Sequence, residues 1–85
     1  MTKANKFIVR ILSGNSDQNI EFTDVIQLLV SLQFELRTKG SHHIFWKNGI
    51  DEIINLQPNG KKAKAYQIKQ IRNILIKYKL IDHES

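Results

Sequence analysis

The 85 residues contain no cysteine, one proline, four glycines and no long apolar run. A chain without cysteine has no disulfide to stabilise it, which fits a reducing cytosol. Its longest apolar runs are triplets, such as residues 7–9 and 28–30, whereas a membrane span needs about 18 apolar residues. The N-terminus shows no signal-peptide core. We therefore expect one soluble, cytoplasmic domain over residues 1–85, near the small end of what folds unaided.

Positive charge is concentrated in the second part of the chain. The net charge is +5 and the pI is about 9.7. Residues 1–36 hold three Lys/Arg and four Asp/Glu, whereas residues 37–85 hold ten and four. Polyphosphate binding is the commonest reason for such a bias, because each neutralised phosphate releases a counterion. Solubility alone is the other explanation.

Apolar residues recur with helical spacing at about residues 4–13, 22–33 and 65–79, which predicts three helices. Between the second and third helices the period changes to two, which predicts strands at 34–37, 41–47 and 50–56. Tight turns are expected at Lys39-Gly40 and Asn48-Gly49. The order α-α-β-β-β-α predicts an α+β fold, a three-stranded antiparallel sheet with helices on one face. The other face would be open to solvent or a partner.

The two predicted turns fix which residues share a face of the sheet. The face toward the helices would carry the apolar set, which is Phe34, Leu36, His43, Phe45, Ile54 and Leu56. The open face would carry Glu35, Arg37, His42, Ile44, Trp46, Asp51, Ile53 and Asn55. In this register His42 lies opposite Arg37 and Asn55. A slip of one residue would exchange His42 with His43.

Three segments together resemble one protein family over roughly residues 22–79. Gly40-Ser41-His42-His43-Ile44-Phe45 follows a helix end at Leu32-Gln33-Phe34. Ile54-Asn55-Leu56-Gln57-Pro58, a lysine-rich loop and Tyr66-Gln67-Ile68-Lys69-Gln70-Ile71-Arg72 come next. In this order the motifs resemble HicA toxins, and residues 1–20 would be an N-terminal helix and loop added to the core at 22–79.

The resemblance implies a fold similar to double-stranded-RNA-binding domains and an endoribonuclease that cleaves mRNA. It also implies a HicB-type antitoxin as partner, with the toxin a monomer when free and part of a hetero-oligomer when inhibited. The family's catalytic histidine is the first one after Gly-Ser, which is His42 here. No cofactor, metal or membrane is implied. Two departures are visible: Gln33 replaces a glycine common in the family, and Asn59-Gly60 replaces a second histidine found in many relatives.

RNA carries its own nucleophile, because its 2′-hydroxyl can attack the adjacent phosphorus. A histidine side chain can take or give the proton near neutral pH, and cations beside it stabilise the transition state. We expect His42 to act as general base or acid. Arg37, Lys39 and Lys47 are candidate phosphate ligands. Ser41 or Asn55 could orient the substrate or the ring.

Further lysines, Lys61, Lys62 and Lys64, cluster before the last helix, where related folds contact phosphates. Lys69 and Arg72 would continue this basic surface. The alternative for each is a solvated side chain.

His43 is expected to be half-buried and hydrogen-bonded. Adjacent strand residues point to opposite faces, so His42 and His43 cannot chelate one metal ion together. The third histidine, His83, lies near the C-terminus.

The apolar residues Ile44, Trp46 and Ile53 on the open face suggest a docking surface, which the antitoxin could cover. Alternatively Trp46 stacks on a base, or the register differs and Trp46 is in the core. At the level of function, the alternatives to the enzyme are a non-catalytic RNA-binding module on the same fold and a protein-interaction domain.

Overall fold

The computed structural model describes residues 3–80, with side chains from residue 6 onward, so His83 lies outside the described residues. Its helices are α1 (Lys3–Ser13), α2 (Phe22–Ser31) and α3 (Ala65–Lys77), with a 3-10 turn η1 (Asp17–Asn19). Its strands are β1 (Glu35–Lys39), β2 (His42–Trp46), β3 (Ile54–Leu56), β4 (Pro58–Asn59) and β5 (Lys62–Ala63). No helix within residues 3–80 has both the length and the apolar character needed to cross a membrane.

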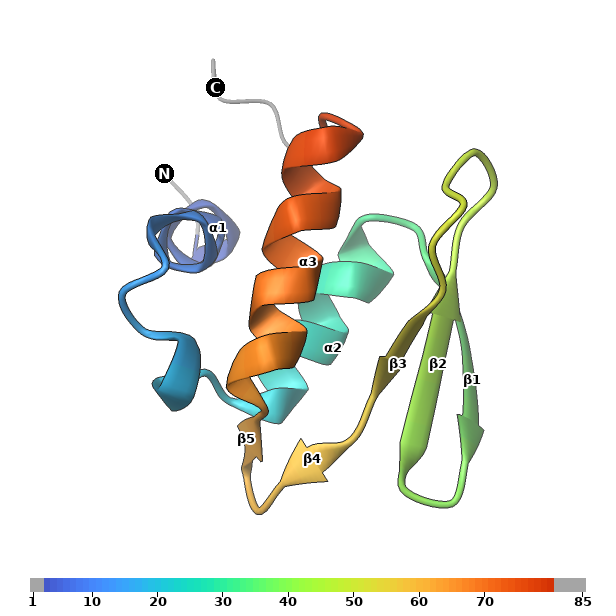
Figure 1. The fold of residues 1–85 in the computed structure, drawn as a ribbon, viewed down its shortest axis with the longest axis horizontal. Helices are drawn as coiled ribbons and strands as arrows, with labels where there is room; N and C mark the ends of the chain where they lie inside the picture. Colours follow the sequence, from blue (N-terminus) through green and yellow to red (C-terminus); the bar gives the residue numbers. More distant parts are fainter. Residues whose placement is uncertain (1–2, 81–85) are drawn as a thin grey trace.

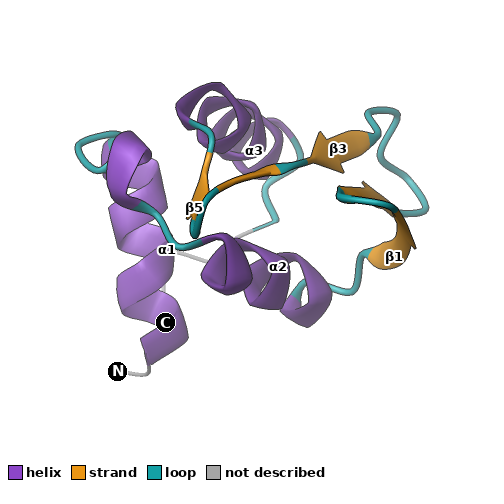
Figure 2. Cartoon of the chain, turned by 90° about the horizontal axis from the view of Figure 1, so that it is seen from below, coloured by secondary structure: helices purple, strands orange, loops and turns teal. Residues whose placement is uncertain are grey.

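The elements form three layers (Figures 1 and 2). The antiparallel sheet β1-β2-β3 lies on one side, α2 and α3 lie in the middle, and α1 lies on the side of these helices away from the sheet. The order α-α-β-β-β-α and the α+β class are confirmed, and the architecture is consistent with a double-stranded-RNA-binding-domain-like fold. One face of the sheet is covered by helices and the other is open.

The core lies between the sheet and the two central helices. Phe45, Ile54 and Leu56 on the sheet are fully buried, and they join one cluster with residues of α2 and α3. From α3 the buried residues include Ile68, Ile71 and Leu75, as the helical spacing predicts. Burial of these side chains is the main term that favours the folded chain.

The register of both hairpins differs from the predicted one by two residues. Leu36 pairs with Phe45, and Lys39 pairs with His42, so the first turn is Gly40-Ser41 and not Lys39-Gly40. In the second pair, Phe45 lies opposite Ile54. A shift of two residues preserves the alternation of the pleat, so the paired strand residues keep the faces predicted for them. Leu36 on the helix side is nevertheless 38% exposed, and Asp51 and Ile53 precede β3 instead of lying in it.

The chain between β2 and α3 contains more structure than its sequence suggests. The third strand begins only at Ile54, because residues 47–53 form a loop around the Asn48-Gly49 turn. The expected loop after Pro58 contains a second hairpin, in which Pro58 pairs with Ala63 and β5 bridges to Glu21 at the start of α2. These two-residue strands are too short to show any periodicity.

Helix α2 is followed by a left-handed residue, Gln33, whose φ is 73°, at the position where glycine is common in the family. The backbone N–H of Phe34 donates to the carbonyl of Leu29, and that of Gln33 donates to Val30. This is a Schellman motif, which usually has glycine at the left-handed position. Gln33 therefore carries backbone strain that glycine would not.

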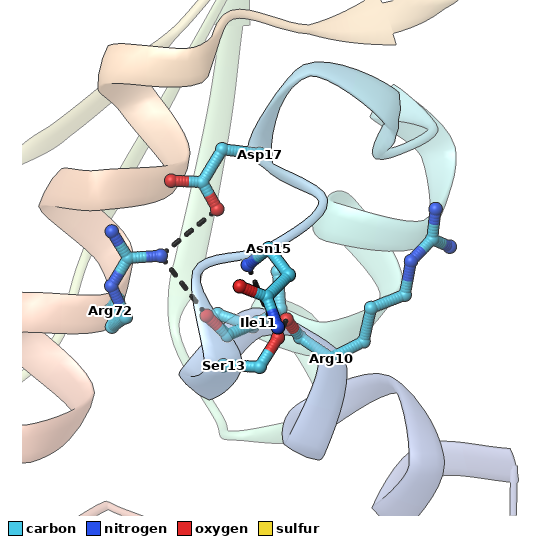
Figure 3. A network of polar contacts seen from close by, with 6 residues as sticks. All are labelled: Arg10, Ile11, Ser13, Asn15, Asp17 and Arg72. Carbon is cyan, nitrogen blue, oxygen red and sulfur yellow. Dashed lines mark hydrogen bonds and ion pairs between the residues drawn. The ribbon is translucent and has the colours of Figure 1, made fainter.

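Helix α1 is tied to the core by Arg72 of α3 (Figure 3). Its Nη1 donates to Asp17 Oδ1 at 2.9 Å and to the carbonyl of Ile11 at 3.1 Å. The two charged side chains are only 16% and 21% exposed. Arg72 was expected to extend a basic surface, and this expectation is wrong, because the guanidinium is engaged within the protein.

Candidate functional site

His42 is the first residue of β2 and is exposed on the open face of the sheet, the face predicted for it. Lys39 lies directly across the hairpin. The Nδ1 atom of His42 is 3.1 Å from Oδ1 of Asn55, which lies on the same face in β3. The imidazole is therefore open to a ligand and has one polar partner.

Two cations of β1 share this face with His42. Arg37 lies opposite Ile44, one pleat repeat along from the Lys39–His42 pair. Arg37 and Lys39 are exposed, and neither forms an ion pair with any side chain that the structure describes. Their charges are thus available to a phosphate group. Lys47 is not brought to this place, because it lies five residues along the strand direction, roughly 17 Å from His42.

The three clustered lysines lie on the β4–β5 hairpin and its exit. Lys61 is exposed in the turn, Lys62 lies in β5, and Lys64 immediately precedes α3. This hairpin and the β1–β2 turn lie at the same end of the molecule, the lower end in Figure 1. Lys62 Nζ is 3.3 Å from Glu21 Oε1, so its charge is partly compensated. The hairpin thus adds cationic side chains at the end of the molecule that carries His42.

The end of β3 beside His42 is held by a buried side chain of α3. Gln67 is 1% exposed. Its side-chain amide, in the orientation that satisfies both the oxygen and the nitrogen, forms two hydrogen bonds with the backbone of Gln57. It accepts from the Gln57 backbone N–H at 3.1 Å and donates to the Gln57 carbonyl at 3.3 Å. The Gln57 side chain donates to Ser41 Oγ at 3.3 Å. Gln67 is not recognisable from the sequence, since an isolated glutamine in a helix has no periodic signal.

His43 points to the core side, as the pleat predicts. Its ring packs edge-on against Phe22, with 5.0 Å between ring centroids, and its Nδ1 is 3.3 Å from the Ser41 carbonyl. Half-buried and partnered, His43 is a packing residue in this structure. Within the described side chains, no three His, Cys, Asp or Glu residues come together as a metal site would require.

The loop between β2 and β3 is fastened to the end of α3. Tyr78 and Lys77 both donate to the carboxylate of Glu52, at 2.5 and 2.9 Å. The bond from Tyr78 and then that from Lys77 hold the pKa of Glu52 below its ordinary value. The same contact raises the pKa of Lys77. This fastening fixes one end of the open face.

The open face also carries apolar side chains. Trp46 is 40% exposed and lies opposite Glu35, while Ile53 is 61% exposed. Both border an open hollow with the β2–β3 loop. Trp46 is therefore not a core residue, and the register alternative that would bury it is excluded. Half-buried Ile44 connects this apolar area to His42.

Comparison with known proteins agrees with the motifs. No curated protein and no solved structure matches the chain. A family model described as the HicA toxin of bacterial toxin–antitoxin systems matches residues 22–78, which is two thirds of the chain. The match spans α2, the whole sheet and α3, and so includes His42, Asn55 and the lysines of the β4–β5 hairpin. The chain belongs to the HicA toxin family.

Proposed function

We propose that this toxin is an endoribonuclease that cleaves mRNA with His42 and requires no metal ion. The observation that carries the proposal is an exposed imidazole on the open sheet face, with Arg37 nearby and Lys39 directly opposite it. Neither cation is paired with an acidic side chain among the residues that the structure describes. Imidazole is the side chain best suited to move a proton at neutral pH. Cations held at the site lower the energy of a transition state that gathers negative charge on phosphate oxygens.

In the proposed reaction the RNA supplies its own nucleophile. The 2′-oxygen forms a bond to the adjacent phosphorus and the bond from phosphorus to the 5′-oxygen breaks. The products are a 2′,3′-cyclic phosphate and a 5′-hydroxyl. His42 takes the proton of the 2′-hydroxyl or gives a proton to the leaving oxygen, a contribution of about 10²–10⁴-fold in rate.

Binding of the RNA backbone is assigned to the cations at the same end of the molecule. Arg37 and Lys39 would hold the phosphate at the cleavage point, and Lys61, Lys62 and Lys64 would hold phosphates further along. Ser41, whose hydroxyl is already bonded by Gln57, is in place to shape the turn beside His42. Lys47 is too far from His42 to contact the reacting phosphate, and it would reach only a distant part of the substrate.

Inducible expression in bacteria tests this function. The wild-type chain should arrest growth and lower mRNA levels, and His42→Ala should relieve both effects while the protein accumulates normally. Lys6→Ala, which changes an exposed lysine on α1, the helix on the side away from the sheet, is the control and should remain toxic. Growth arrest that persists in the His42→Ala variant would instead favour the non-catalytic RNA-binding module.

The antitoxin is proposed to dock on the apolar part of the open face and to cover His42 at the same time. Trp46 and Ile53 are the exposed anchors, and large side chains of this kind carry much of the energy of an interface. With the antitoxin co-expressed, Trp46→Ser should escape neutralisation. Ile76→Ser, which removes an apolar side chain of α3 that is 60% exposed, should not. Neutralisation of the Trp46→Ser toxin would place the interface elsewhere.

A further inference from the structure

We propose that Asn55 is a positioning residue that fixes the proton of neutral His42 on Nδ1 and leaves Nε2 as the general base. The proposal rests on the proposed nuclease function and selects between the two roles left open for the ring. It follows from the 3.1 Å contact between His42 Nδ1 and Asn55 Oδ1. An amide oxygen only accepts hydrogen bonds, so the bond requires a proton on Nδ1.

Without a partner, an exposed imidazole would rotate about its side-chain bonds and exchange its proton between both nitrogens. Either motion removes the lone pair from the place where the 2′-hydroxyl must lie, because proton transfer needs about 2.6–3.2 Å between heavy atoms. The bond from Nδ1 restricts both motions. It also directs Nε2 away from Asn55, and the Nε2 lone pair is then free to receive the substrate's proton.

Asn55 can hold the ring of His42 in place because the backbone of Asn55 is itself fixed by buried residues. Its neighbours in β3, Ile54 and Leu56, are both fully buried. Gln57, two residues after Asn55, is held by the buried Gln67, whose side chain bonds both the backbone N–H and the carbonyl of Gln57. The strand therefore cannot slide or twist without breaking core contacts, and the exposed amide of Asn55 is carried on a rigid support.

The choice of an amide over a carboxylate has a chemical consequence. A carboxylate at this distance would favour the imidazolium form, which cannot act as a base, and would repel the phosphate that Arg37 and Lys39 are placed to attract. A neutral amide directs the proton without adding negative charge. In the resulting step, Nε2 gains the proton of the 2′-hydroxyl, the 2′-oxygen bonds to phosphorus and the bond from phosphorus to the 5′-oxygen breaks. The departing 5′-oxygen takes a proton from water, and the hydroxide so formed removes the proton from Nε2 and restores the neutral ring.

The first experiment reads the tautomer directly and needs no activity. Two-dimensional ¹H–¹⁵N spectra of the ¹⁵N-labelled full chain, recorded above the imidazole titration, should show His42 protonated on Nδ1. Asn55→Ala should show a mixture or a majority with the proton on Nε2. Wild-type His42 with its proton mainly on Nε2 would overturn the proposal. Backbone spectra report whether each variant is folded.

The second experiment uses RNA cleavage. Asn55→Ala should lower kcat about tenfold and leave KM within about twofold, because substrate contacts remain while the base is disordered. Asn55→Asp should move the acid limb of the pH–rate profile upward by about one unit, since a nearby negative charge favours the imidazolium. Asn73→Asp adds the same charge at an exposed position of α3 and should not move it. A variant Asn55→Ala with unchanged kcat would contradict the positioning role.

The two experiments separate this proposal from the nuclease function. If the wild type cleaves no RNA but shows the Nδ1 tautomer, the nuclease function fails while the structural role of Asn55 stands. If the wild type cleaves RNA and shows the Nε2 tautomer, the function stands and the role of Asn55 is refuted.

Discussion

Replacing Arg72 by Met should destabilise the protein without weakening its affinity for RNA. The guanidinium of Arg72 joins α3 to the turn η1 through Asp17 and to the end of α1 through the carbonyl of Ile11 (Figure 3). Methionine keeps much of the apolar length of the side chain but removes both hydrogen bonds. It also leaves the Asp17 carboxylate, which is 21% exposed, without its partner.

The magnitude follows from the number and burial of these bonds. A hydrogen bond to a charged group contributes about 1.5–3 kcal/mol, and the lower half of this range applies where some water reaches the pair. Two bonds therefore give a loss of about 3–4.5 kcal/mol. A domain of this length has a free energy of unfolding of roughly 4–13 kcal/mol. The melting temperature should fall by about 12–36 °C.

Urea and thermal unfolding measure this loss, and a double-mutant cycle with Asp17→Asn isolates the ion pair. We expect a coupling free energy of about 1–2 kcal/mol between the two side chains. The affinity for RNA and its dependence on salt should match the wild type wherever the variant is folded. A change in stability below about 0.5 kcal/mol, the usual range for surface substitutions, would refute the structural role. So would a weaker salt dependence, which would show that Arg72 contacts phosphate.

Lys61→Met should make RNA binding less dependent on salt, lowering the slope of log K against log salt concentration by about 0.7–0.9 in a titration, because one phosphate contact is lost. Gln33→Gly should raise the free energy of unfolding by about 0.5–1 kcal/mol in urea, since its φ is 73°; a loss of stability would contradict the strain. Because Tyr78 and then Lys77 hold the pKa of Glu52 below its ordinary value of 4.5, the stability from this contact is present at neutral pH and is lost as the pH falls through the lowered pKa. Unfolding curves of Glu52→Gln and wild type should therefore differ at neutral pH and converge in acid, and a constant difference would exclude the linkage.

The sequence predicts which face of the sheet each residue occupies better than it predicts the pairing. Alternation of apolar and polar residues at positions 34–37 is a local signal, so His42 could be assigned to the open face and His43 to the core side. The register depends on which residues form the turn, and Gly40-Ser41 is used where Lys39-Gly40 is equally plausible locally. A shift of two residues leaves the alternation unchanged, so His42 stays on the same face of the sheet as Arg37 and Lys39.

Features that depend on contacts distant in sequence could not be predicted. In the β4–β5 hairpin, Lys62 bridges to Glu21, which lies more than 40 residues earlier in the sequence. The residues of the hairpin alone therefore do not predict that it forms. Arg72 looks like any surface cation until the turn at Asp17 is placed beside it. The role of Gln67 is recognisable only in the folded chain, where the backbone of Gln57 lies against α3 and bonds the Gln67 amide. His42 could be proposed from the sequence because a short motif and the alternation of residues 34–37 indicate the same residue.

Cleavage of RNA by purified protein tests the central role of His42 most directly. With end-labelled single-stranded RNA and excess EDTA, the wild type should produce fragments that end in a 2′,3′-cyclic phosphate and begin with a 5′-hydroxyl. His42→Ala, shown to be folded by its unchanged melting curve, should cut about 10²–10⁴-fold more slowly. A folded His42→Ala protein that cuts as fast as the wild type would contradict the assignment of catalysis to this imidazole.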